Sequence, residues 1–316
     1  MTTCGMGDEQ SCCASLEVAG GMYNRAYVDT TGKQLGTETN PATVSSFRLD
    51  AYLVTVGRFR QFVKAVNPTA SGPGTGGWMP ASMSGKHAHL NAGKGLVSSL
   101  STTTFEPGWA VADTANIAPT DANLTCDTMS ATWTPSAGVN LNETRPINCV
   151  NWYEAYAFCI WDGGFLPSDA EWEYAAAGGS MQLEYPWGAM DPRGNQQSSY
   201  AISADDNADC TYPPPAAACS GLPNIAPVGT ATLGAARWGQ LDMAGDVSEW
   251  TLDDQHDAVA SCDDCVDLSA SGTRVIRGGA FDTGLEYLRP GDPSVALAET
   301  TTTRMKELGF RCARVP

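Results

Sequence analysis

Sulfur and imidazole are the most reactive groups that this sequence offers. Eleven cysteines are spread along it: Cys4, Cys12, Cys13, Cys126, Cys149, Cys159, Cys210, Cys219, Cys262, Cys265 and Cys312. The pair Cys262-x-x-Cys265 is typical of a redox site or of half a zinc site. No second pair follows at zinc spacing, so a structural disulfide is favoured. His87 and His89 form a His-x-His pair that can bind a metal on a strand, but no other ligand is near, and a solvated loop is favoured.

The number of cysteines also bears on the compartment of the protein. Many cysteines in loop-like sequence are typical of disulfide-bonded proteins from oxidising environments. Cys126 with Cys149 and Cys210 with Cys219 are candidates for local pairs, and the odd total leaves at least one cysteine over. We therefore expect an extracytoplasmic or secreted protein, although the first residues lack the apolar core of a signal peptide.

The charge balance excludes one class of partner. The 316 residues carry a formal net charge of −17, which argues against nucleic acid, since phosphates require Lys and Arg. No apolar run approaches the roughly 18 residues of a transmembrane helix, so no such segment is expected. The excess of carboxylates suits a hard cation such as calcium, or it serves solubility alone.

Helix start signals identify the elements that would position these groups. Thr55 is an N-cap for an amphipathic helix, whose apolar face comprises Val56, Phe59, Phe62, Val63 and Val66. Asn151 with Glu154, and Ser168 with Glu171, have the spacing of capping boxes and predict two further helices.

The order of the segments predicts one domain. Residues 1–16 are expected to be a flexible N-terminal lead-in, and residues 17–316 to form a single domain. Long irregular insertions are expected at about 67–146, because this stretch is rich in Gly, Ser, Thr, Ala and Pro. No tandem repeat and no composition break mark a second domain.

Six motifs in a fixed order carry a resemblance to a known family. They are "NWYEAYAFCIWDGGFLPSDAEWEYAAAGG", "YPWG", "PVGT", "GQLDMAGDVSEWTLD", "RVIRGGAF" and "GFRCAR". Together they resemble the formylglycine-generating enzyme family, also called the sulfatase-modifying factor domain, strongly from about residue 148 onward. The resemblance implies an α+β fold of C-type-lectin-like type. It has low regular secondary structure, two main helices and small antiparallel sheets.

The catalytic centre that the resemblance implies is altered in this sequence. The family's enzymes oxidise a sulfatase cysteine to formylglycine with oxygen and a copper ion held by two thiolates, the ligands that Cu(I) prefers. Those thiolates would fall at Thr283 and Leu288, which supply a weak hard ligand and no ligand. Ala280 and Ser248 replace the family's usual serine and oxygen-pocket tryptophan. Copper is therefore not expected, and formylglycine synthesis is disfavoured.

A calcium loop is implied by the same resemblance. In "DMAGDVSE", Asp242 and Glu249 would supply carboxylates, and Gly245 and Val247 would supply backbone carbonyls. The alternative is that the two carboxylates only cap turns, and calcium is favoured.

One family disulfide is also implied, between Cys159 in the first helix of the motif region and Cys312 in the final strand. The loop that it closes is long, so it would stabilise the fold by about 4 to 5 kcal/mol in the chain-entropy model.

Two functions remain open. The first is a calcium-stabilised scaffold that binds a protein or a surface ligand through the loop 280–308, as in the variable proteins of diversity-generating retroelements. Its candidate contact residues are Asp282, Thr283, Leu285, Glu286, Tyr287, Asp292, Ser294 and Val295. The second is an oxidoreductase of the family that modifies sulfatase cysteines. The bland alternative is an irregular loop that covers the core.

Overall fold

The computed structural model describes residues 3–4, 10–27, 40–67, 76–137, 139–194, 196–255, 261–292 and 295–316. Its longest helices begin where the sequence predicts. Thr55 caps α1 (Val56–Val66) by accepting from the Arg58 N–H. Full capping boxes start α3 (Trp152–Trp161) and α4 (Asp169–Ala176). The helices α2 (Asp121–Leu124) and α5 (Gln197–Tyr200) are single turns.

The strands are short and form several small sheets. The largest has the order β15-β14-β11-β16, from Leu297–Thr300, Thr273–Arg277, Ser248–Asp254 and Leu308–Gly309. Three-stranded sheets have the orders β17-β6-β3, from Ala313–Arg314, Phe47–Asp50 and Ser15–Val18, and β12-β5-β4, from Cys262–Asp263, Pro41–Val44 and Gly21–Asn24. A third has the order β13-β7-β8, from Cys265–Val266, Val97–Ser98 and Ser101–Phe105. Two-stranded sheets join β1 (Thr3–Cys4) to β2 (Gln10–Ser11) and β9 (Asp209–Cys210) to β10 (Ala217–Ala218).

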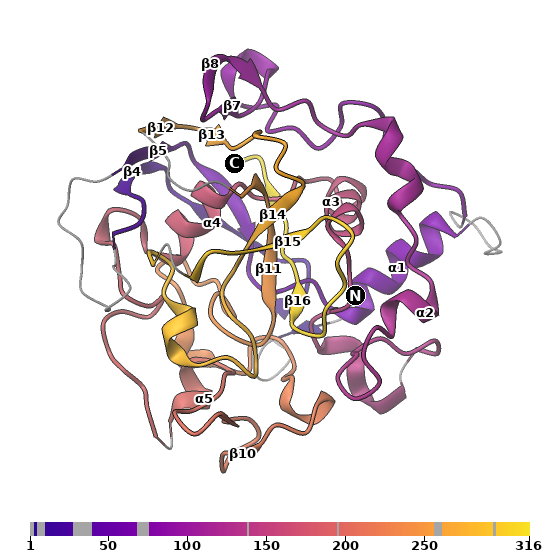
Figure 1. The fold of residues 1–316 in the computed structure, drawn as a ribbon, viewed down its shortest axis with the longest axis vertical. Helices are drawn as coiled ribbons and strands as arrows, with labels where there is room; N and C mark the ends of the chain where they lie inside the picture. The colour runs from indigo at the N-terminus through magenta and orange to yellow at the C-terminus, as the bar shows by residue number, and fades with distance from the viewer. Residues whose placement is uncertain are drawn as a thin grey trace.

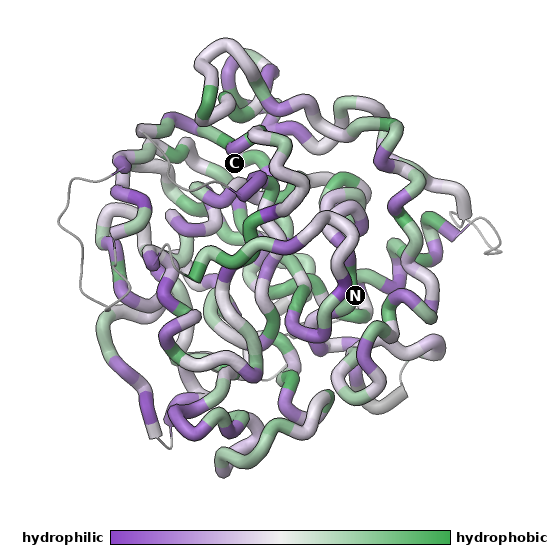
Figure 2. Tube along the Cα trace, viewed as in Figure 1, coloured by the Kyte–Doolittle hydropathy of each residue, from purple (hydrophilic) through white to green (hydrophobic). Residues whose placement is uncertain are grey.

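The four-stranded sheet runs through the middle of the molecule, with α3 and α4 beside it (Figure 1). Hydrophobic segments concentrate in this central region (Figure 2). The largest buried cluster joins Phe59 of α1 and Phe158 of α3 to Phe310, and the Phe59 and Phe158 rings stack with centroids 5.7 Å apart. Aromatic burial therefore connects α1, α3 and the end of the chain.

The predicted disulfide between Cys159 and Cys312 is present and lies in the same cluster. Further disulfides join Cys126 to Cys149, Cys210 to Cys219 and Cys262 to Cys265. Cys12 is also disulfide-bonded, and Cys13 is an exposed free thiol. The Cys262-x-x-Cys265 pair is thus a local bridge.

Both regions that were expected to be irregular contain ordered structure. Within 1–16, the residues from Gln10 onward include strands, Cys12 is buried, and Arg58 donates to the Cys12 carbonyl. The described part of 67–146 holds β7, β8, α2 and the 3₁₀ segment η2 (Val111–Asn116).

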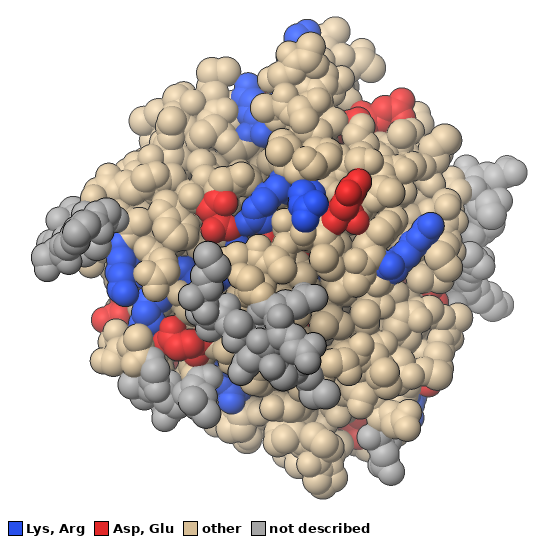
Figure 3. Space-filling view, turned by 180° about the vertical axis from the view of Figure 1, so that it is seen from behind, with Lys and Arg blue, Asp and Glu red and all other residues tan. Residues whose placement is uncertain are grey.

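The outer surface bears on the classes of partner. On the face seen in Figure 3, basic and acidic side chains form small mixed groups, and no broad basic surface appears there. Within the described ranges, no helix has both the length and the apolar character needed to cross a bilayer.

The interpretation of His87 as part of a solvated loop is wrong. His87 is fully buried, with Nδ1 3.0 Å from Glu106 Oε2 and Nε2 3.0 Å from Glu171 Oε2. Burial lowers the pKa of His87, but the two carboxylates outweigh this effect and raise it to about 10. His89 is half-buried, and burial lowers its pKa. Because Glu171 caps α4, the charged His87 ties the insertion to the start of that helix.

This bridge predicts a pH-dependent stability. The folded-state pKa of His87 lies above its ordinary value of about 6.5 in an unfolded chain. Its contribution is therefore complete below about pH 6.5 and is lost as pH rises through about 10. The unfolding free energy should fall by up to about 1.4 kcal/mol per pH unit across that window.

Denaturant unfolding between pH 6 and pH 10 measures this slope. His87→Gln should flatten it, whereas the neighbouring change His89→Gln should leave it in place. Equal slopes for the wild type and His87→Gln would contradict a charged His87 in the folded protein.

Candidate functional site

A buried ion pair fixes the strand end that leads into the site. At the end of β14, Arg277 donates from Nε to Asp169 Oδ1 at 2.6 Å and from Nη2 to Asp169 Oδ2 at 2.9 Å. Arg25 donates to the same carboxylate at 2.7 Å. Asp169 is the first residue of α4, so this bidentate contact holds the following glycines over that helix.

The two positions that correspond to the copper ligands converge on Gly279. Gly279 has φ +67°, and a Cβ added there would lie 2.6 Å from Leu288 Cδ2 and 2.9 Å from Thr283 Oγ1. Both side chains therefore lie close to Gly279, although they are five residues apart in sequence. The groups that approach this glycine are a hydroxyl and a methyl group, and a methyl group cannot coordinate a metal.

The two side chains beside Gly279 are engaged in contacts within the protein. Thr283 Oγ1 accepts from the Ala280 N–H at 2.8 Å and lies 3.0 Å from the Ala280 carbonyl oxygen, to which it donates. Leu288 is buried in an apolar cluster with Tyr185. The Cys210 sulfur lies 3.3 Å from the Phe281 carbonyl oxygen, but it is bonded to Cys219.

Few of the predicted contact residues face solvent. Glu286 and Tyr287 are exposed on the 3₁₀ segment η7 (Leu285–Leu288), and 39% of Tyr287 is accessible. Asp282 is half-buried, and its carboxylate pairs with Lys306 Nζ at 2.6 Å. Val295 is half-buried as well.

The other predicted contact residues are less available. Leu285 packs into the same apolar cluster as Leu288, and Asp292 is buried. Thr283 is half-buried and bonded to Ala280, and Ser294 lies outside the described residues. Of the predicted contact residues that the structure describes, Glu286 and Tyr287 are therefore the exposed ones.

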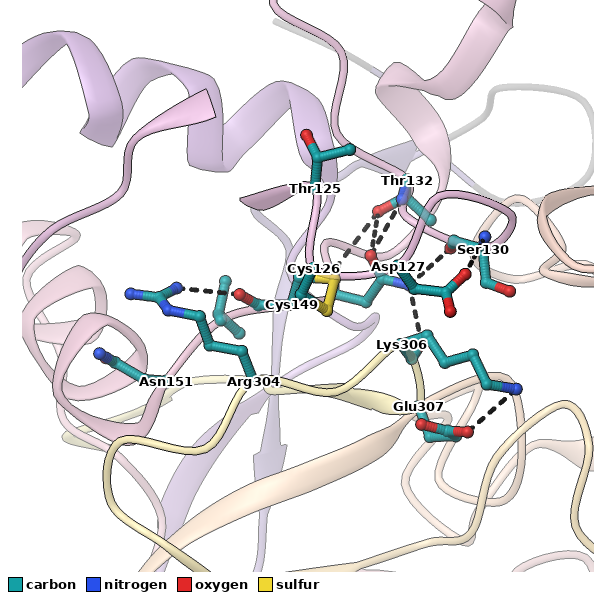
Figure 4. Close-up of a disulfide and its surroundings, with 12 residues drawn as sticks. Thr125, Cys126, Asp127, Ser130, Thr132, Cys149, Asn151, Arg304, Lys306 and Glu307 are labelled. Atoms are coloured by element: carbon teal, nitrogen blue, oxygen red, sulfur yellow. Dashed lines mark hydrogen bonds and ion pairs between the residues drawn. A yellow bond between two sulfur atoms is a disulfide. The ribbon is translucent and has the colours of Figure 1, made fainter. Parts of the chain in front are cut away.

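The returning end of the loop is held by the segment before α3 (Figure 4). Asn148 Nδ2 donates to the Lys306 carbonyl at 2.7 Å, and Arg304 donates to the Cys149 carbonyl at 2.9 Å. Cys149 is in turn bonded to Cys126. Both ends of the loop are thus fixed to the core.

The predicted calcium loop lies just before β11 and follows an unusual backbone path. Asp242, Gly245 and Asp246 have φ values of 57°, 82° and 64°. Asp242 Oδ2 accepts from the Gly229 N–H at 2.7 Å. Val247 is buried, so the motif is enclosed by the core.

Glu249 is shared between this loop and an arginine that the sequence analysis did not identify. Its Oε2 accepts from Arg311 Nε at 2.7 Å, and the Trp172 side chain also interacts with this carboxylate and lowers its pKa. Arg311 also donates to the carbonyl oxygens of Leu241, at 3.0 Å, and of Asp242, at 2.8 Å.

Burial disfavours the charged form of the three carboxyl groups in this loop. Burial raises the pKa of Asp242 to about 6, against the Gly229 hydrogen bond and Arg311. Burial, and then the charge of Asp242, raise the pKa of Asp246, whose Oδ2 is buried and unpaired in the described part of the chain. Burial also raises the pKa of Glu249, although Arg311 opposes it.

The oxygen atoms of this loop are of the kind that bind a hard cation. No three His, Cys, Asp or Glu side chains form a metal-binding group among the described residues. The expected ligand set needs only two carboxylates, because the carbonyls of Gly245 and Val247 complete it. Carboxylate and carbonyl oxygens are the ligands that calcium prefers, so the residue types in this loop suit it.

Comparisons with known proteins agree with this geometry. The family described as "Sulfatase-modifying factor enzyme 1-like domain" matches residues 5–316. The formylglycine-generating enzyme of Thermomonospora curvata is 27% identical over 280 residues, 86% of this chain and 83% of that protein. The mouse "Inactive C-alpha-formylglycine-generating enzyme 2" is 29% identical over 188 residues, 57% of this chain and 52% of that protein. The chain thus spans about half of that mouse relative.

Solved structures share the fold. PvdO from Pseudomonas aeruginosa has a TM-score of 0.61 at 18% identity, covering 96% of this chain and 94% of that one. Treponema denticola variable protein 1 has a TM-score of 0.52 at 17% identity, covering 96% and 95%. The α+β, C-type-lectin-like architecture expected from the motifs is confirmed. The chain belongs to the formylglycine-generating enzyme, or sulfatase-modifying factor, family.

Proposed function

We propose that this protein is a non-copper member of the family that binds a protein or surface ligand through the exposed part of the loop 280–308. The observation that carries the proposal is the meeting of Thr283 and Leu288 at Gly279. A scaffold that keeps the fold of a family without the ligands of its site fits a changed function, because fold and function are separable. The mouse relative that is named inactive also supports a function other than formylglycine synthesis.

The anchoring of the loop supports a binding role. Surface loops held by rigid elements are common recognition sites, and tyrosine is a frequent anchor residue in interfaces. Exposed Tyr287 and Glu286 stand on buried Leu285 and Leu288, so the surface is preorganised. The fold-level likeness to a protein titled as variable is compatible with this role.

We further propose that the protein works in an extracytoplasmic, oxidising compartment. Disulfides that connect distant parts of the core, such as Cys159–Cys312, persist in such environments.

One observation favours an oxidase instead. The sequence is 27% identical over 280 residues to an enzyme named for formylglycine generation. That function would require a substrate cysteine to be oxidised near Gly279 without copper-binding thiolates. A direct assay of aldehyde formation therefore separates the two candidates.

The first prediction concerns copper. Purified wild-type protein should not retain Cu(I) against a chromogenic chelator, nor convert a Cys-x-Pro-x-Arg peptide to its aldehyde with copper and oxygen. Thr283→Cys/Leu288→Cys should gain a tight Cu(I) site, because the two side chains already converge. Each single cysteine variant is the matched control and should bind copper weakly. Aldehyde formation by the wild type at enzymatic turnover would sink the proposal.

The second prediction concerns the loop surface. Glu286→Ala/Tyr287→Ala should lower partner capture from a native extract by at least about tenfold, because truncating an interface hot spot costs about 2 kcal/mol or more. Quantitative mass spectrometry of the captured proteins measures the change. Met22→Ala, at an exposed position on β4, is the control. A captured set that is unchanged in the double variant would argue against this surface.

The third prediction follows from our proposal that calcium binds the loop Asp242–Glu249. A ligand specific to the folded state stabilises it by about 2.7 kcal/mol at a hundredfold excess over its dissociation constant. Exhaustive chelation should therefore lower the melting temperature, and added calcium should restore it. Glu249→Gln, which keeps an acceptor for Arg311, should blunt this response, and Asp121→Asn should not. A melting curve that is insensitive to chelation rules the site out.

A further inference from the structure

A cavity lies against α3 and β11, apart from the loops described above. It has a volume of about 100 Å³, and none of its lining residues belongs to the loop 280–308 or to the calcium loop. Its inner wall comprises Trp152 and Tyr156, one turn apart on α3, and Leu252 of β11, all of them buried. Exposed Pro107 and Ala110 lie at its rim. The cavity therefore has an aromatic interior and an outward-facing edge.

One wall of the cavity carries an unpaired hydrogen-bond donor. The Arg274 guanidinium carbon lies 4.2 Å from the centre of the Trp152 ring, which fixes its position. Its Nη1 donates to the Leu252 carbonyl at 2.7 Å and lies 3.4 Å from Asp254 Oδ2. Its Nε is buried and has no acceptor among the described residues. The side chain as a whole is 18% accessible, so an acceptor supplied by a ligand would be stabilising beside the guanidinium.

A second lining residue supplies an acceptor. Asp113, on η2, is half-buried, and its only nearby counter-charge among the described residues is Arg274. The other acid at the cavity, Glu106, accepts from the His87 and Leu96 backbone N–H groups and pairs with the His87 ring. Glu106 is therefore occupied, which leaves the Asp113 carboxylate as the acceptor that is available to a ligand.

We propose that this cavity binds a primary carboxamide, either as a small free amide or as a Gln or Asn side chain of a peptide partner. The amide oxygen accepts from the Arg274 guanidinium, and the amide N–H donates to the Asp113 carboxylate. The short alkyl part lies against Tyr156 and Leu252. A carboxamide offers one acceptor and one donor on a neutral planar group, and this matches the two groups that the cavity leaves unpaired.

Charge and size distinguish this ligand from its close analogues. A carboxylate of the same shape lacks the donor and meets the negative charge of Asp113. An alkylammonium lacks the acceptor and meets the positive charge of Arg274. The cavity is smaller than the roughly 150 Å³ space that accommodates benzene in an engineered protein core, so it suits a group the size of propanamide.

Ligand-observed NMR on the full chain tests the proposal with propanamide, propanoate and propylammonium as three probes of equal size. Propanamide should bind at least tenfold more tightly than either ion. Asp113→Ala should weaken propanamide binding at least tenfold, and Asp121→Ala on the neighbouring helix should not. Equal binding of propanoate or propylammonium would overturn the assignment.

Two variants that fill or cover the cavity keep the test valid if one of them fails to fold. Leu268→Phe adds bulk at a half-buried wall position, and Ala110→Trp covers the exposed rim. Either one should abolish propanamide binding, and unchanged binding in a folded blocking variant contradicts the site. A glutamine-containing tripeptide serves as a fourth probe. Tighter binding of that peptide identifies a partner's side chain as the source, and equal binding identifies a free amide.

Discussion

The contact between Arg277 and Asp169 is the constraint on which the rest of the site depends. It joins the last residue of β14 to the first residue of α4 through two short hydrogen bonds, and Arg25 shares the same carboxylate. Burial raises the pKa of the adjacent Glu173 to about 7, although Arg277 and Arg25 oppose this shift. The loss of either arginine would therefore raise this pKa further. Breaking one member of a buried pair costs about 3 to 5 kcal/mol, because the other charge stays unpaired.

Local signals in the sequence were sufficient to predict where the helices begin. They could not predict contacts between side chains that are far apart in the sequence. Thr55, Asn151 and Ser168 cap helices because the backbone N–H groups that they satisfy are three residues away. His87 was misread because its carboxylate partners lie 19 and 84 residues further along the chain. No local pattern indicates such a pairing, and histidine has no strong preference for the interior or the surface.

The site shows the same division between local and long-range information. The family motifs located Thr283 and Leu288, and their convergence at Gly279 follows from the fixed ends of the loop. The orientation of the remaining loop residues could not be predicted, because an irregular segment has no periodicity that separates an inner from an outer face. Leu285 is therefore buried beside exposed Glu286. Arg311 was missed as a partner of Glu249 for a related reason, since 62 residues separate them.

The last residues of the chain complete two sheets, one of which contains strands from near its first residues. β17 pairs with β6, which pairs with β3, and β16 adds in parallel to the central strand β11. A chain without residues 307–316 lacks an edge strand of two sheets and the Phe310 ring, which packs against Phe59 and Phe158. Contacts so distant in sequence slow folding, because a long loop must close before they form. The short segment 308–314 therefore matters to folding as much as a core helix does.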